Sequence, residues 1–183
     1  MDAKQKLKVE KQKSAAVRRA TKDDAELLAE IGARTFSDTF AADNTAEDMA
    51  DYVAKSFGVD QQAAELSDPS LTFLIAEIDN RVAGYAKLQL GPAPGCVDGP
   101  SPIELSRLYV LQDWIGRGVA QVLIEECFSV ARQAARQTIW LGVWERNTRA
   151  QAFYRKCGFA MVGTQAFQLG SDLQTDLVMM REL

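Results

Sequence analysis

The segment from residue 103 to residue 143 restricts the fold more than any other part of the sequence. A strand-like apolar run at 103–110 leads into a turn with two glycines, a helix-like stretch at about 118–137 and a second strand-like run at 138–143. Two strands joined through a helix of that length pair in parallel, because the crossover returns the chain to the same edge of the sheet. The chain therefore has to build a sheet with a parallel pair and helical cover.

The rest of the chain predicts further strands and helices on either side of this unit. The antiparallel candidates are a strand at 15–19, a hairpin at 71–78 and 82–90, and a terminal hairpin at 159–169 and 173–180. Thr21 is a candidate N-cap for a helix that runs through Ala33, and further helices are expected at 46–57 and 147–157. Residues 36–44 are expected to form a connector or a binding loop, and 91–100 a surface loop. The order predicts an α/β fold with a mixed, mostly antiparallel seven-stranded sheet and helices on both faces.

Composition is that of one ordinary globular domain. The chain has 183 residues, of which 47% are hydrophobic and 25% charged, so we expect a single domain at 15–183. Residues 1–14 are rich in lysine and are expected to form a flexible, charged, solvated tail rather than an arm that binds nucleic acid. A net charge of −4 argues against nucleic acid as a partner and suits a cationic small molecule better.

The chain contains no histidine, which excludes Ser-His-Asp triads, Cys-His dyads and histidine-ligated metals. Acid and base catalysis must then use carboxylates, tyrosine, cysteine, lysine, the backbone or water. The three cysteines, Cys96, Cys127 and Cys157, are far apart and unpaired in number, so we expect reduced thiols in a cytoplasmic protein without a metal site. No apolar run is long enough to cross a membrane, so no membrane partner is expected.

The glycine turn before the long helix is a candidate anion site. Gly116 and Gly118 allow close approach to a helix N-terminus, where unpaired N–H groups and the helix dipole favour phosphate, and Arg117 adds a positive charge. The alternative is a tight turn that only packs strand against helix. A Walker loop is excluded because Val119 follows where lysine is needed, and a dinucleotide fingerprint because Gln121 stands near its third glycine.

The segment 147–159 then carries a family resemblance. Its pattern N-x-x-A-x-x-F-Y-x-x-x-G-F, together with the G-x-G-x-A turn and the intervening helix and strand, resembles the acetyl-CoA-binding half of the GNAT superfamily of N-acetyltransferases. The element order extends this resemblance over residues 15–183. Segments 34–40, 140–147 and 169–177 look like the PaiA-type bacterial polyamine N-acetyltransferases, which acetylate spermidine and spermine. The resemblance implies a GNAT fold, acetyl-CoA as co-substrate, no metal and a small-molecule amine as acceptor, and leaves a homodimer open.

The resemblance also assigns cofactor contacts. The end of the strand before the turn would splay from its neighbour and offer backbone groups to the pantetheine arm and the thioester oxygen, through Leu108, Tyr109 and Val110. The turn and the first helical residues would hold the pyrophosphate, through Gly116, Arg117, Gly118, Val119, Ala120 and Gln121. Asn147 would bond the pantetheine region, and it is also a candidate N-cap of the following helix.

Two residues are implied to be catalytic. Tyr154 falls at the position that donates a proton to the CoA sulfur, and the alternative is a core aromatic. Glu104 falls at a strand position where some GNAT enzymes keep a general base, acting directly or through water, and the alternative is a solvated carboxylate. Ser106, on the same face if strand alternation holds, is a candidate to anchor that water.

The resemblance implies that the first helices and the terminal hairpin flank the site of the acceptor amine. We expect Phe36 and Asp38 to contact the amine, with a core role as the alternative for Phe36 and Phe40. Gln165 is a third candidate because it stands where the polyamine branch carries histidine, and Ile115 replaces the Gln or Arg that usually opens the pyrophosphate motif. The resulting hypothesis is an amine N-acetyltransferase, with a peptide or protein acetyltransferase and a non-catalytic acyl-CoA sensor as alternatives.

Overall fold

The computed structural model describes residues 15–183, so the tail expected at 1–14 lies outside the described residues. Its seven strands form one sheet in the order β1-β2-β3-β4-β5-β7-β6. The strands are β1 (Ala16–Arg19), β2 (Leu71–Ile78), β3 (Arg81–Gln89), β4 (Pro102–Val110), β5 (Thr138–Trp144), β6 (Ala160–Leu169) and β7 (Asp172–Glu182). The α-helices are α1 (Ala25–Phe40), α2 (Ala46–Phe57), α3 (Val59–Ser67), α4 (Val119–Gln133) and α5 (Thr148–Lys156). Two short 3-10 turns, Lys22–Asp24 and Gln112–Trp114, precede α1 and α4.

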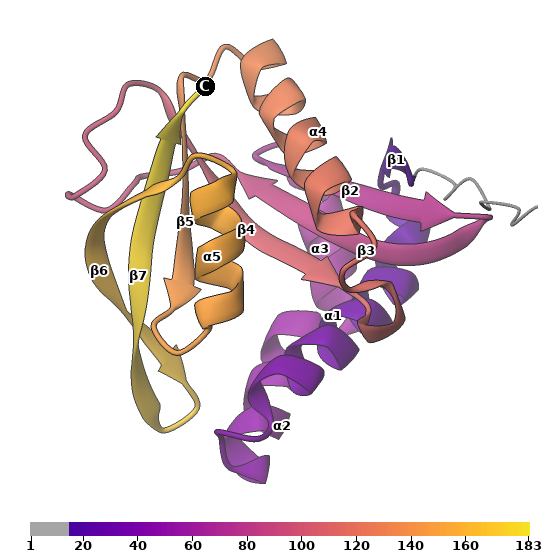
Figure 1. The fold of residues 1–183 in the computed structure, drawn as a ribbon. Coiled ribbons are helices and arrows are strands. Elements are labelled where there is room, and N and C mark those ends of the chain that lie inside the picture. Colours follow the sequence, from indigo (N-terminus) through magenta and orange to yellow (C-terminus); the bar gives the residue numbers. More distant parts are fainter. Residues whose placement is uncertain (1–14) are drawn as a thin grey trace, which may run out of the picture.

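Strand directions confirm the predicted mixed sheet. Strands β1 to β4 pair antiparallel, β4 pairs with β5 in parallel through α4, and β5, β7 and β6 pair antiparallel. The parallel pair is the one that the 103–143 pattern requires, in which a single helix, α4, returns the chain to the neighbouring strand. Figure 1 shows the helices distributed over the two faces of this sheet.

Each face of the sheet has its own apolar core. On one face, here called the α4 face, α4 and α5 pack with residues such as Leu123, Leu141 and Met179. On the other, the α1 face, helices α1 to α3 cover two smaller clusters, one around Tyr85 and one around Phe36. A ligand held between β4 and β5 can thus be approached by side chains from two separate sets of helices.

Apolar spacing predicts a buried stripe on helix α4 at Val119, Val122, Leu123, Cys127, Val130 and Ala134, and the structure differs from it at Val122 and Ala134. Val122 is partly exposed and Ala134 is exposed, while Ile124 and Phe128 are buried. The helix ends at Gln133, which leaves Ala134 as its C-cap outside the packed surface.

The N-terminal helical region also differs from the prediction. Thr21 starts the 3-10 turn, where its N–H donates to the Asp24 carboxylate at 2.7 Å, and Asp24 becomes the N-cap of α1. Helix α1 continues to Phe40, so the expected connector at 36–44 is helical over its first half, because burial of Phe36 favours another turn of helix. Helix α3 was not predicted, since its sequence has no clear apolar stripe.

Candidate active site

Strands β4 and β5 separate to form a fork in the sheet. They pair at only three positions, the last of them Glu104 opposite Trp140. Beyond that point β4 stays with β3 as far as Val110, while β5 stays with β7 as far as Trp144. Figure 1 shows the two arrows diverging. The splay expected at 108–110 is therefore confirmed, and it leaves the β4 edge toward β5 without a strand partner.

A β-bulge in β4 accompanies the divergence. Pairing with β3 shifts between Leu105 and Arg107, so Ser106 is the extra residue, and its hydroxyl donates to the Lys87 carbonyl at 3.3 Å. A bulge bends its strand and interrupts the strict alternation of side chains. The expectation that Ser106 shares a face with Glu104 rested on that alternation, which the bulge removes.

The glycine turn presents unbonded backbone N–H groups at the start of α4. Gly116 and Gly118 have φ values of +78° and +83°, and no atom of the described residues lies within 4 Å of where a Cβ would stand on either. The first helical hydrogen bond of this region is donated by the Val122 N–H to the Gly118 carbonyl, at 3.1 Å. The preceding N–H groups of α4 are free to bind an anion. The positive φ values explain why glycine stands at both positions, and the open space leaves room for a ligand.

Two arginines lie beside this turn. The guanidinium of Arg117 is 5.3 Å from the centre of the Trp114 ring, and that of Arg81, from the β2–β3 turn, is 5.9 Å from the same ring. Arg81 is far from the turn in sequence, so its proximity could not be predicted. Ile115 is 36% exposed, so the position that usually carries a polar contact here presents an apolar side chain to solvent.

Asn147 caps α5, as one of its two expected roles required. Its side-chain oxygen accepts the N–H of Ala150 at 3.1 Å. The turn before it is held by Gln151, a buried residue whose side-chain NH2 donates to the carbonyls of Trp144 and Glu145 at 3.2 and 2.8 Å. Sequence reasoning missed Gln151, although a glutamine inside the N-x-x-A-x-x-F-Y segment is a polar residue that needs partners if buried.

Tyr154 lies on the α4 face, 9% exposed, with its ring against Phe153 and Phe159. Burial raises the pKa of its phenol well above the ordinary value, with smaller contributions from Cys127 and Cys157. The hydroxyl therefore stays protonated near neutral pH and can act as a proton donor. It belongs to the core and is at the same time the acid candidate.

Glu104 lies on the α1 face at the point where the fork begins. Because it is largely buried, desolvation raises its pKa, and the nearby positive charge of Lys87 opposes that effect. Lys87 itself is 6% exposed and bonds Glu65 of α3 at 3.0 Å. A carboxylate with a raised pKa is a better base than a solvated one, provided that it is ionised.

The three expected acceptor residues are not brought together. Phe36 is 2% exposed and stacks on Tyr52 at 4.5 Å, which is the core role that the sequence left open. Asp38 is exposed on α1. Gln165 of β6 lies across the sheet, where its amide nitrogen and a carboxylate oxygen of Asp176 stand 2.7 and 3.0 Å from a Cβ built on Gly142.

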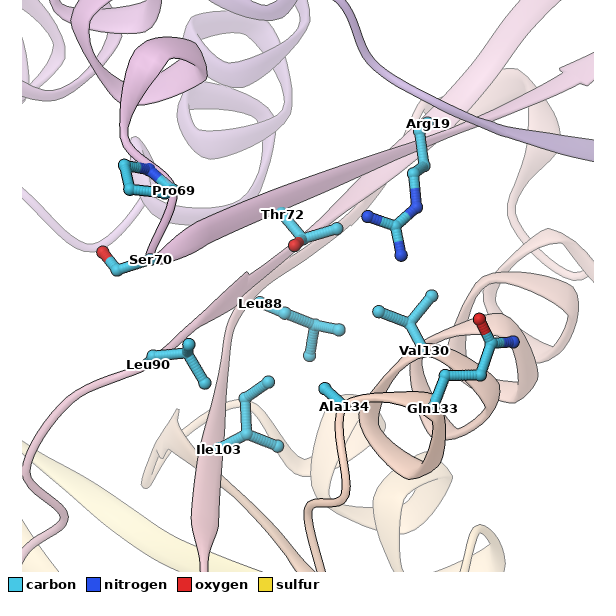
Figure 2. Close-up of a pocket in the computed structure, with 10 residues that line it drawn as sticks. All are labelled: Arg19, Pro69, Ser70, Thr72, Leu88, Leu90, Ile103, Val130, Gln133 and Ala134. Atoms are coloured by element: carbon cyan, nitrogen blue, oxygen red, sulfur yellow. The ribbon is translucent and has the colours of Figure 1, made fainter.

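None of the predicted site residues lines either of two cavities of the described residues. The larger cavity, about 340 Å³, lies between the first strands and the C-terminal end of α4, with Arg19 pointing into it (Figure 2), and no predicted site residue lines it. A smaller one, about 110 Å³, opens beside Trp144 and includes Asp43 and Asp172. Within residues 15–183 no cluster suited to a metal ion occurs, and no helix has the length and apolarity needed to traverse a bilayer.

Comparison with known proteins bears directly on this geometry. The model of the acetyltransferase (GNAT) family matches residues 28–159. An uncharacterised N-acetyltransferase of Lactobacillus delbrueckii subsp. lactis is 35% identical over 162 residues, which are 88% of this chain and 93% of that protein. One of Mycobacterium tuberculosis is 37% identical over 160 residues, 87% of this chain and 98% of that protein.

Solved structures share the fold. The PaiA N-acetyltransferase of Thermoplasma acidophilum, in complex with coenzyme A, superposes with a TM-score of 0.76 at 20% identity, covering 93% of this chain and 99% of that chain. The ribosomal-protein-alanine N-acetyltransferase of Brucella melitensis reaches 0.63 at 24% identity, covering 92% and 99%. One fold therefore accompanies differently named acetyltransferases.

Proposed function

The chain belongs to the acetyltransferase (GNAT) family, and on that premise we propose that it acetylates a small primary amine, a polyamine such as spermidine or spermine. Family membership makes it an acyltransferase with acetyl-CoA as co-substrate. The acceptor, and the roles of Tyr154 and Glu104 as acid and base, are the proposal.

The fork between β4 and β5 is the observation that carries the proposal. The opening begins at Glu104, a partly buried carboxylate on the α1 face, and Tyr154 is buried on the α4 face of the same sheet. A proton donor and a proton acceptor on opposite faces of one gap suit a reaction in which a nucleophile enters from one side and a leaving group departs on the other.

The residues present fit acetyl-CoA. The free N–H groups at the start of α4, with Arg117 and Arg81 nearby, would hold its pyrophosphate, and the unpaired β4 edge and Asn147 would hold the pantetheine arm. When bound, the thioester supplies an activated acetyl group. Backbone N–H groups at 108–110 would then stabilise negative charge on the carbonyl oxygen.

Proton transfer completes the reaction. As the amine nitrogen forms its bond to the acetyl carbon, Glu104 accepts the amine proton, directly or through water. As the carbon–sulfur bond breaks, Tyr154 donates its phenolic proton to the sulfur, which leaves as the thiol. The buried, neutral state of Tyr154 supports the acid role, and the raised pKa of Glu104 supports the base role.

A cationic acceptor is supported by charges around the α1-face side of the fork. Asp176 lies beside Gly142, and Asp43 and Asp172 line the small cavity next to Trp144. Together with the net charge of −4, these carboxylates favour approach of an amine that carries more than one positive charge.

Release of free thiol from acetyl-CoA, measured over a panel of polyamines, amino sugars and peptides, tests the proposal. We expect turnover to be largest with polyamines. Tyr154→Phe should lower kcat by about 100-fold or more at unchanged affinity for CoA, because general acid catalysis typically contributes 10²–10⁴-fold. Tyr85→Phe is the matched control, since Tyr85 is also fully buried but belongs to the cluster on the α1 face.

Other outcomes would point elsewhere. A strong preference for peptides would replace the polyamine by a protein N-terminus or lysine. No turnover across the panel, with CoA binding intact, would contradict catalysis and leave the acyl-CoA sensor as the surviving interpretation.

A further inference from the structure

Aromatic side chains cluster on the α1 face beside Trp144, the last residue of β5. Phe40 of α1 lies 5.5 Å from Trp144 at the end of β5, ring centre to ring centre. Tyr52 of α2 lies 5.6 Å from Phe167 of β6. These four rings, here called the aromatic wall, come from helices and strands that are remote in sequence. Aromatic faces attract ammonium groups and pack well against aliphatic chains.

Asp176 is the carboxylate next to the aromatic wall. It is the cross-strand neighbour of Trp144 on one side and of Gln165 on the other. Its side chain reaches over Gly142, which has no side chain to fill that space. Burial raises the pKa of the Tyr52 phenol, and Asp176 is close enough for its charge to add a smaller contribution.

Asp176 has no cationic partner among residues 15–183. None of the ion pairs or side-chain hydrogen bonds of this part of the chain includes its carboxylate. Burial alone raises its pKa to about 6. A partly buried carboxylate without a partner destabilises the fold, and a cationic ligand that paired with it beside the aromatic rings would offset that cost.

Glu104 and Asp176 lie on the same face but are well separated. Glu104 pairs with Trp140, four residues before Trp144, which pairs with Asp176. With about 3.3 Å per residue along β5 and about 4.8 Å across each of two strand spacings, their Cα atoms are about 16 Å apart. One ammonium group cannot contact both carboxylates, whereas two amino groups joined by an aliphatic chain can.

We propose that Asp176, with the aromatic wall, binds a second ammonium group of the acceptor while the reacting amine lies near Glu104, so that the enzyme selects linear diamines and polyamines over monoamines. This inference rests on the proposed function. Asp176 takes no part in proton transfer and acts on acceptor affinity.

Matched amine pairs test this assignment. Acetylation of butane-, hexane- and octanediamine is compared with that of butyl-, hexyl- and octylamine, by thiol release at saturating acetyl-CoA. We expect wild type to prefer each longer diamine over its monoamine by about tenfold or more, and Asp176→Asn to raise KM for diamines by a similar factor, as expected for loss of a charged pair. The KM for monoamines should stay unchanged. Asp60→Asn, which removes one exposed charge from α3, should change neither.

Each contrary result has a distinct meaning. Equal loss with diamines and monoamines in Asp176→Asn, in a protein that melts normally, would make Asp176 catalytic or structural and overturn the inference. Equal use of both amine classes by wild type would overturn it too, while leaving amine acetylation standing. If wild type acetylates no amine at all, the proposed function fails first.

Discussion

The two sides of the β4–β5 fork are built in different ways. On the α4 face, the proposed anion site consists mainly of consecutive residues, a strand end, a glycine turn and the first turn of α4, and it would bind through backbone N–H groups. On the α1 face, side chains from α1, α2, β4, β5, β6 and β7 meet, and their chemistry depends on carboxylates and aromatic rings.

This difference separates what is common to the family from what is particular to this chain. Backbone groups at a glycine turn bind the same phosphate whichever side chains surround it. A side-chain surface assembled from six elements changes with any one of them, so acceptor choice can vary while cofactor binding stays the same. Substitutions on the α1-face side should therefore change the use of the acceptor, and substitutions on the α4-face side should change the affinity for CoA.

The largest expected effect is on the acceptor side. Glu104→Gln removes the proposed base without changing its shape, so kcat should fall by about 100-fold while the affinity for CoA stays the same. The raised pKa of Glu104 sets the sign of its pH dependence, because the carboxylate loses its charge as pH falls through a value above the ordinary 4.5. Wild-type kcat should fall over that range, and the variant should lack this limb.

The amine substrate also changes its ionisation with pH, so the pH profile needs a control. Its ionisation affects wild type and variant alike, so the ratio of their rates isolates Glu104. A ratio that is constant with pH would assign the base elsewhere.

A smaller effect is expected on the cofactor side. Gly118→Val places a β-branched residue at a φ of +83°, where L-residues are strained, so the turn should leave the conformation that presents the free N–H groups of α4. CoA affinity, measured by calorimetry, should fall by about tenfold or more, since strain of this kind costs about 1–2 kcal/mol. Preference among acceptors should not change.

Gly91→Val is the matched substitution. Gly91 also has open space around its Cβ position but lacks a positive φ and lies in the 91–100 loop. A similar loss of CoA affinity in both variants would argue that the turn has no special role.

The same contrast explains what could be predicted from sequence. Most strands and helices and the parallel pair follow from local periodicity and from the 103–143 unit, and the structure agrees with them except in the second half of α1 and at α3. The fork was expected from the family resemblance, and the structure contains it. The acceptor side depends on which distant residues meet. The sequence predicted Phe36 and Asp38 as acceptor residues, yet the fold buries Phe36, exposes Asp38 and leaves Asp176 beside Gly142 without a partner among residues 15–183. The roles of all these residues remain predictions.

The smallest expected effect concerns stability and comes from Asp176 itself. Its pKa is raised from 3.8 to about 6, so between these values the folded protein holds a proton that the unfolded chain has released. The free energy of unfolding then decreases as pH rises from 3.8 to 6 and stays lower above it. Asp176→Asn removes this loss. Because the carboxylate is partly exposed, the gain above pH 6 should be about 1 kcal/mol, or about 2–4 °C in Tm.

Thermal melts with and without a diamine connect this stability effect to binding. Below pH 3.8 the two proteins should melt alike, because Asp176 is then protonated in both states of wild type. Above pH 6, a diamine should raise the Tm of wild type but not that of Asp176→Asn, since a ligand stabilises only the state that binds it. A variant that is no more stable than wild type above pH 6 would mean that Asp176 already has a partner. A residue that binds the acceptor can destabilise the protein without ligand and stabilise it once the acceptor is bound. A residue with only a structural role is not expected to do so.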